Sequence, residues 1–171
     1  DIIDRCSSVG RPLSGCKVRF FNALVTILNV MHVIPGDIVV FKDEIPRDLY
    51  FVYQGALQMV DEHDRVLSVI RSDVPNQAPV AGEVPFFLGI NHIKAMKAKE
   101  DVPDIQLLVL SKERSLELFA EYPEDYTTIC TNLMLEFDLT IEGRPIPGAD
   151  VDATDKDKME TTARIVESMN H

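Results

Sequence analysis

Hydrophobic residues recur at helical spacing near the start of the chain. Over residues 14–32 (SGCKVRFFNALVTILNVMH) this spacing predicts a helix with Ser14 as its N-cap, and the apolar stripe consists of Phe20, Leu24, Ile27, Leu28 and Met31. The sequence IPGD at 34–37 then predicts a turn, because Pro35 fixes its own φ angle and Gly36 tolerates a positive one.

Short runs of β-branched and aromatic residues follow this turn, and polar turns separate them, which is typical of antiparallel strands. The runs predicted as strands are 37–41, 48–55, 56–62, 65–70, 92–98 and 105–110. Residues 82–89 (GEVPFFLG) interrupt the series and predict one or two helical turns. Gly55 predicts a bend or a close approach between backbone segments. Because so many short strands succeed one another, the sequence predicts a closed or rolled antiparallel sheet.

Helical spacing returns after the last predicted strand. Residues 111–122 begin at Ser111, a favoured N-cap residue, and residues 123–137 begin at Pro123, which suits a first helical turn. The second helix carries one apolar stripe, which consists of Tyr126, Ile129, Cys130, Leu133, Met134 and Phe137. The polar, acidic remainder predicts a linker followed by a short helix at 157–169.

The composition fits one domain with extensions, since the chain has 171 residues, of which 46% are hydrophobic. A net charge of −11 argues against nucleic acid and anionic membrane surfaces as partners, because both favour a basic face. The three cysteines are widely spaced and the four histidines are scattered, which predicts reduced thiols and no metal site. The apolar run at 23–34 is too short to span a bilayer. Because the chain begins with Asp1, we expect it to be part of a longer protein.

Three motifs in this order resemble the cyclic nucleotide-binding domain family: PGD at 35–37, LYFVYQGALQ at 49–58 and GE at 82–83. The resemblance covers residues 15–139 and implies an α+β fold. In this fold an antiparallel, jelly-roll-like β-roll is flanked by an N-terminal helix and two C-terminal helices. The remaining residues would be the end of a helical linker (1–14) and an acidic tail with a short helix (140–171).

The segments PLSGCKVRFFNAL, GEVPFFLGI and NLMLEFDL resemble the ion-channel branch of the family, including plant-type potassium channels and the ether-à-go-go type. This resemblance implies a domain on the cytoplasmic side of a membrane, with the rest of the parent channel as its partner. It also implies a homotetramer in the full-length protein, whereas we expect this segment alone to be a monomer.

The phosphate-binding cassette of the family begins with Gly-Glu, and Gly82, Glu83 and Val84 stand at that position. The resemblance implies that Gly82 presents its N–H to the phosphate and that Glu83 contacts the ribose 2′-hydroxyl. Nucleotide-binding members continue to a Pro-Arg-Ala-Ala-Thr-type run. Here His92 stands at the arginine position and Ala95 at the threonine or serine position.

The missing arginine predicts weak binding, because a guanidinium meets two phosphate oxygens at once and losing one partner of a buried charge pair costs about 2–5 kcal/mol. Losing the hydroxyl at the Ala95 position removes about 1 kcal/mol more. One hypothesis is that a charged His92, with Lys94 on the same strand face, replaces the arginine in a pH-dependent way. The favoured alternative is that His92, Lys94 and Lys97 are ordinary strand residues whose charges reach solvent.

The family resemblance makes the last helix a lid over the pocket, and Met134 and Phe137 are its lid residues. They would cap a nucleotide base or, in the favoured alternative, pack into the roll. Without ligand, a side chain or the tail would fill the pocket, with residues 139–141 as candidates.

The sequence therefore predicts a regulatory channel domain that has no cofactor and little affinity for cAMP or cGMP. The alternative is a genuine cAMP or cGMP sensor. An enzyme is disfavoured, because no nucleophile elbow, Walker loop or paired-carboxylate motif is present, and Glu113, Glu117 and Glu121 predict a solvated helix face. A kinase regulatory subunit would carry an inhibitor run of the Arg-Arg-x-Ser/Ala type, which is missing.

Overall fold

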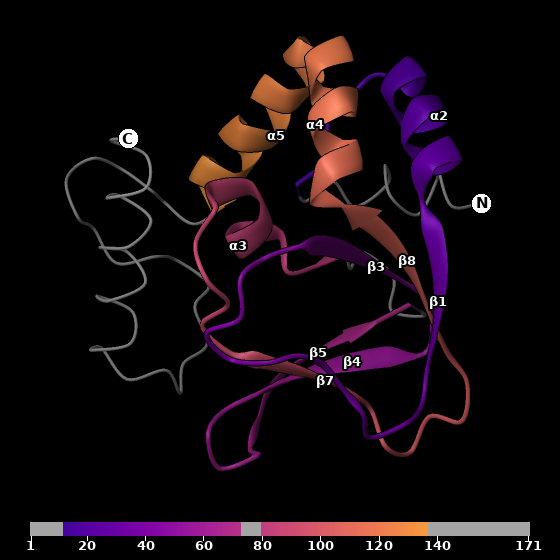
Figure 1. Cartoon of the computed structure of the whole chain (residues 1–171), viewed down its shortest axis with the longest axis vertical. Coiled ribbons are helices and arrows are strands. Elements are labelled where there is room, and N and C mark those ends of the chain that lie inside the picture. The colour runs from indigo at the N-terminus through magenta and orange to yellow at the C-terminus, as the bar shows by residue number, and fades with distance from the viewer. Residues whose placement is uncertain (1–11, 73–79, 137–171) are drawn as a thin grey trace, which may run out of the picture.

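Two antiparallel sheets form a β-roll, and three helices gather at one end of it (Figure 1). The computed structural model describes residues 12–72 and 80–136. Within these ranges one sheet has the order β1 (Asn29–Val33), β8 (Ile105–Ser111), β3 (Asp48–Gln54), β6 (Val80–Ala81). The other has the order β2 (Ile38–Val40), β7 (Ala95–Ala98), β4 (Ala56–Val60), β5 (Val66–Arg71). The predicted α+β fold with an antiparallel roll is confirmed.

The helices are α2 (Val18–Ile27), α3 (Glu83–Leu88), α4 (Lys112–Glu121) and α5 (Pro123–Glu136). The Oγ atom of Ser111 accepts a hydrogen bond from the N–H of Arg114 at 3.3 Å, so the predicted cap of α4 is confirmed. Figure 1 shows α3 between the strands and the three helices at the end of the roll. None of the described helices is both long and apolar enough to cross a lipid bilayer.

The first helix is shorter than its apolar stripe predicts. It begins after Lys17, which makes no side-chain cap, and it ends at Ile27. Residues 29–33 form the edge strand β1, in which Met31 is paired with Leu107 of β8. Backbone pairing with a distant strand therefore outweighs the local helical spacing.

The last predicted strand before β8 is also shorter than expected. β7 begins only at Ala95, so His92 and Lys94 precede the strand and share no strand face. The backbone of His92 is instead bonded to a turn far along the chain: its N–H donates to Glu44 O at 2.9 Å, and its carbonyl oxygen accepts from Asp43 N at 2.7 Å. These two bonds replace strand pairing before Ala95.

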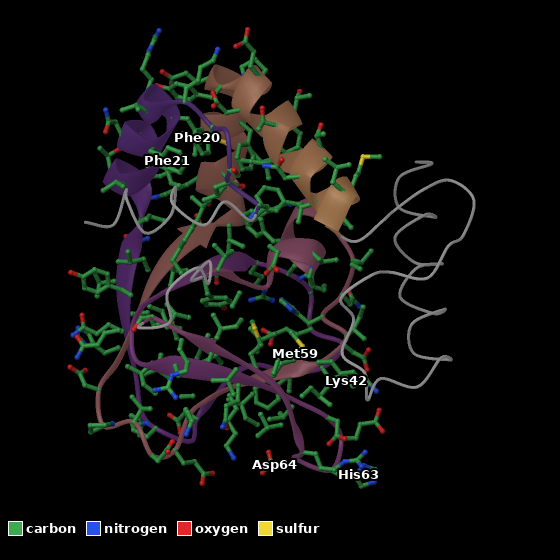
Figure 2. All side chains as sticks on the ribbon, turned by 180° about the vertical axis from the view of Figure 1, so that it is seen from behind. Phe20, Phe21, Lys42, Met59, His63 and Asp64 are labelled. Atoms are coloured by element: carbon green, nitrogen blue, oxygen red, sulfur yellow. The ribbon has the colours of Figure 1, made fainter. Side chains whose placement is uncertain are left out.

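Two hydrophobic clusters hold the fold together. One lies between the two sheets and contains Val40, Tyr50, Val52, Leu57, Ala81, Met96, Ala98, Ile105 and Leu107. The other joins α2, α3, α4 and α5 to the roll and includes Phe20, Phe21, Leu24, Phe86, Phe87, Leu118, Ile129 and Leu133. Figure 2 shows Phe20 and Phe21 at the helical end and His63 and Asp64 at the opposite end. The predicted linker up to residue 11, residues 139–141 and the helix at 157–169 lie outside the described residues.

Candidate functional site

The predicted cassette begins at a left-handed turn. Gly82 has φ 78° and immediately precedes α3, and its carbonyl oxygen accepts the N–H of Phe86 at 3.1 Å. The strand β6 fixes the other side of Gly82, because Ala81 is paired with Tyr50 of β3. A positive φ favours glycine, so this residue suits a turn that directs the chain from sheet to helix.

The side chain of His92 lies beside this turn. A methyl group added at Gly82 would be 3.4 Å from His92 Cε1, 3.5 Å from Met96 Cε and 3.9 Å from Tyr50 Cδ2. His92 is 4% exposed, so its imidazole is inside the protein. The favoured expectation of a solvent-reaching His92 on a strand is therefore wrong, because the two backbone bonds to residues 43–44 direct this segment into the roll.

The imidazole of His92 is held in a setting that favours its neutral form. Burial lowers the pKa of His92, and the nearby Glu44 carboxylate partly opposes that effect. Within residues 12–72 and 80–136 we find no side-chain hydrogen bond of this imidazole. A buried polar ring without a hydrogen bond is rare, so it marks the position as a functional candidate.

The lowered pKa of His92 makes stability depend on pH. Because the unfolded chain binds a proton at a higher pH than the folded chain, the contribution of the neutral imidazole is complete above the unfolded value of about 6.5. It is lost as the pH falls through the lower folded value. We expect the free energy of unfolding, measured with urea from pH 8 to pH 5, to fall more steeply in the natural chain than in His92→Gln. Parallel curves would show that His92 has no such role.

Lys94 and Lys97, the other basic candidates, lie near acidic side chains. Lys94 is close enough to Glu62 to contribute to lowering the pKa of that carboxyl. Lys97 is paired with Glu100 at 2.7 Å and with Asp64 at 3.3 Å. The structure thus places each lysine near an acidic side chain that a phosphate would have to compete with.

The remaining cassette positions differ in what they face. Ala95 is the first residue of β7, and the burial pattern alternates along the strand, with Met96 and Ala98 buried. Ala95 therefore points to the opposite face from Met96, which contacts the Gly82 turn. Glu83 begins α3 and is half-buried. Val84 packs against the hydrophobic cluster that joins the helices to the roll. The hydroxyl expected at the Ala95 position would therefore not share the face that contacts Gly82.

The predicted lid is described only in part. Met134 lies near the end of α5 and is 38% exposed, and its role as a lid or packing residue stays a prediction. Its helix buries Ile129 and Leu133 on another face. Phe137 lies outside the described residues.

Sequence reasoning missed Tyr50, Met96 and Glu44 as neighbours of the cassette. Tyr50 belongs to the LYFVYQGALQ motif, whose strand β3 runs beside β6, so this motif contained a usable signal. Burial raises the pKa of Tyr50 to about 12, with smaller contributions from Asp48 and Glu44, so its phenol is protonated at neutral pH.

The described residues offer little for other chemistry. No group of three or more His, Cys, Asp and Glu residues within the described ranges could hold a metal ion. Cys16 and Cys130 are free thiols, and burial raises the pKa of Cys16 to about 12, with a further contribution from Asp125. Glu113, Glu117 and Glu121 are exposed on α4, which confirms the predicted solvated face.

Known structures share this fold. The N-terminal domain of a transcriptional regulator from Streptomyces coelicolor is similar with a TM-score of 0.62 and 16% identity, covering 80% of this chain and 95% of that one. Catabolite activator protein from Thermus thermophilus is similar with a TM-score of 0.56 and 19% identity, covering 72% of this chain and 55% of that one. The chain therefore shares the fold of these two proteins, an antiparallel β-roll with flanking helices.

The sequence is also similar to that of a potassium channel. The potassium voltage-gated channel unc-103 of Caenorhabditis elegans is 23% identical over 142 residues, which are 81% of this chain. The chain spans only 16% of the length of that channel. No protein-family model matches the sequence.

Proposed function

We propose that this chain is a regulatory domain on the cytoplasmic side of a membrane ion channel, and that this channel is a potassium channel. We also propose that the domain does not bind cAMP or cGMP with high affinity. It is noncatalytic and needs no cofactor. Its partner is the rest of the parent channel, in which it belongs to a homotetramer. The similarity to the unc-103 potassium channel supports the channel setting.

The single observation that carries the expected lack of nucleotide binding is the buried imidazole beside Gly82. His92 stands at the position expected for the arginine that binds phosphate, and its lowered pKa favours the uncharged form. A neutral ring offers a phosphate neither a positive charge nor the two parallel N–H donors of a guanidinium. With Met96 and Tyr50 also packed on Gly82, a nucleotide would have to displace side chains before it reached the turn.

A second function is favoured by one property of the same residue. An imidazole that is buried beside Gly82 without a side-chain hydrogen bond could gain a proton and bind a phosphate if a ligand supplied the negative charge. This chain would then be a true cAMP or cGMP sensor whose affinity for the nucleotide rises as the pH falls. Because Lys94 lies near Glu62, we do not expect this lysine to bind the phosphate together with His92.

Calorimetric titration of the whole chain with cAMP and with cGMP at pH 6 and pH 7.5 separates the two functions. We expect no binding heat up to millimolar nucleotide at either pH. Micromolar binding that is stronger at pH 6, and that disappears in His92→Gln, would establish the sensor and overturn our proposal. Micromolar binding that is equal at both pH values would overturn both, since neither function accounts for it.

The channel setting can be tested with a chimaeric channel in a membrane, whose response to nucleotide is measured at the same time. This chain would replace the matching 142 residues of unc-103, and currents would be recorded from excised patches. We expect voltage-dependent current that cAMP and cGMP do not change. Absence of current, while the unmodified channel conducts and the chimera reaches the surface, would contradict a channel role.

A further inference from the structure

Lys112 is the first residue of α4, yet its side chain turns back onto α3. The Nζ atom donates a hydrogen bond to the carbonyl oxygen of Phe86, and it lies 4.6 Å from the centroid of the Phe86 ring. The backbone N–H of Lys112 donates to Arg47 O at 2.7 Å, which anchors the lysine to the roll. One half-buried cation therefore contacts both the backbone and the ring of a single α3 residue.

The helix that Lys112 contacts depends on such outside support. α3 has six residues, and helices this short are unstable without tertiary contacts. Its last turn contains no basic residue, although a positive charge there would favourably oppose the helix dipole. The ammonium group of Lys112 supplies that charge from another element and binds one of the carbonyl groups near the helix end.

Aromatic rings extend the contact from α3 to the terminal helices. The rings of Phe86 and Phe87 meet edge to face with centroids 5.2 Å apart, and Phe87 lies 5.7 Å from Phe119 of α4. Phe119 in turn lies 4.8 Å from Tyr126 of α5. These ring contacts link the position of α3 to both α4 and α5.

We propose that Lys112 is a positioning residue that holds α3, and with it the Gly82 turn, in one place against α4 without any nucleotide. The regulatory meaning of this contact rests on the proposed function: in a domain that does not respond to nucleotide, an internal cation keeps the cassette and the terminal helices in a fixed relation. The contact itself exists whether or not nucleotide binds.

Amide hydrogen exchange in the whole chain tests this role. The useful probes are the N–H groups of Phe86 and Gly89, which donate to Gly82 O and Pro85 O at the two ends of α3. In Lys112→Met we expect both amides to exchange about tenfold faster or more, because a hydrogen bond to a charged group is lost. The amide of Tyr122, which bonds to Leu118 O at the end of α4, should change much less.

Two further variants separate positioning from general stability. Lys112→Arg retains a positive donor that can reach the carbonyl and the ring, so it should restore slow exchange at Phe86 and Gly89. Lys17→Met removes an exposed lysine paired with Glu124, and it should leave both α3 amides unchanged. Equal acceleration of Phe86, Gly89 and Tyr122 in Lys112→Met, or no rescue by arginine, would overturn the proposal.

A measurement on the natural chain keeps the test valid if Lys112→Met fails to fold. A scalar coupling between ¹⁵Nζ of Lys112 and the carbonyl carbon of Phe86 is expected in its NMR spectrum, and its absence would overturn the proposal. Neither this coupling nor the exchange rates require nucleotide. Nucleotide binding in the titration would therefore overturn the proposed function alone, whereas unchanged α3 exchange would overturn the role of Lys112 alone.

Discussion

Gly55→Ala is expected to destabilise the protein by roughly 2–5 kcal/mol, which is the sum of backbone strain and a steric clash. Gly55 joins β3 to β4 and has φ 85°. A methyl group at this residue would lie 2.8 Å from Asp104 O and 2.8 Å from Ile105 Cγ1. Because one of these atoms belongs to the backbone at the start of β8, the clash cannot be relieved by a side-chain rotation.

Gly89→Ala is the matched control for this prediction. Gly89 also has a positive φ, 67°, but a methyl group there would meet nothing within 4 Å. It should therefore cost only the strain of the left-handed conformation, about 1–2 kcal/mol. Urea denaturation of both variants gives the two free energies of unfolding. A loss in Gly55→Ala no larger than that in Gly89→Ala would show that the approach of Asp104 and Ile105 does not constrain the roll.

Gly55 also illustrates which parts of the fold could be predicted from the sequence. An isolated glycine after an apolar run indicated a bend or a close backbone approach, and the structure shows both. The start of α4 was predictable for a similar reason, because the cap formed by Ser111 and Arg114 is local. Such local signals are not always sufficient, because the N-cap predicted at Ser14 is wrong: α2 begins after Lys17, which makes no side-chain cap.

Features that depend on distant partners were not predictable. The local pattern predicts the end of a helix at residues 29–32, whereas these residues form β1 by pairing with β8, which joins Asn29 to the distant Val109. The burial of His92 depends on hydrogen bonds to Asp43 and Glu44, which no local pattern indicates. Within the candidate site, the family resemblance placed Gly82 and His92 in one cassette, but it did not indicate that the imidazole lies against the glycine.

His92→Arg is the variant with the largest expected effect on ligand binding. If the missing guanidinium is what prevents binding, the arginine should raise the affinity for cAMP or cGMP about 30-fold or more, the usual value of a buried charge partner. The His92 ring already reaches Gly82 with its Cε1 atom, so a longer side chain at this position can reach the turn whose N–H would face the phosphate. Calorimetry of the variant beside the natural chain measures this gain.

The same variant should be less stable than the natural chain when no nucleotide is present. His92 is buried beside Met96 and Tyr50, and a guanidinium in that place lacks water, with Glu44 as the nearby opposite charge. Nucleotide at about 100 times its dissociation constant should then raise the free energy of unfolding by about 2.7 kcal/mol.

His92→Lys is the control that separates geometry from charge. It adds a positive charge without the two parallel donors of arginine, so it should gain much less affinity. Equal gains would mean that charge alone was missing from the cassette. A folded His92→Arg that binds nucleotide no better than the natural chain would mean that the packing of Met96 and Tyr50 on Gly82, rather than the histidine, closes the site.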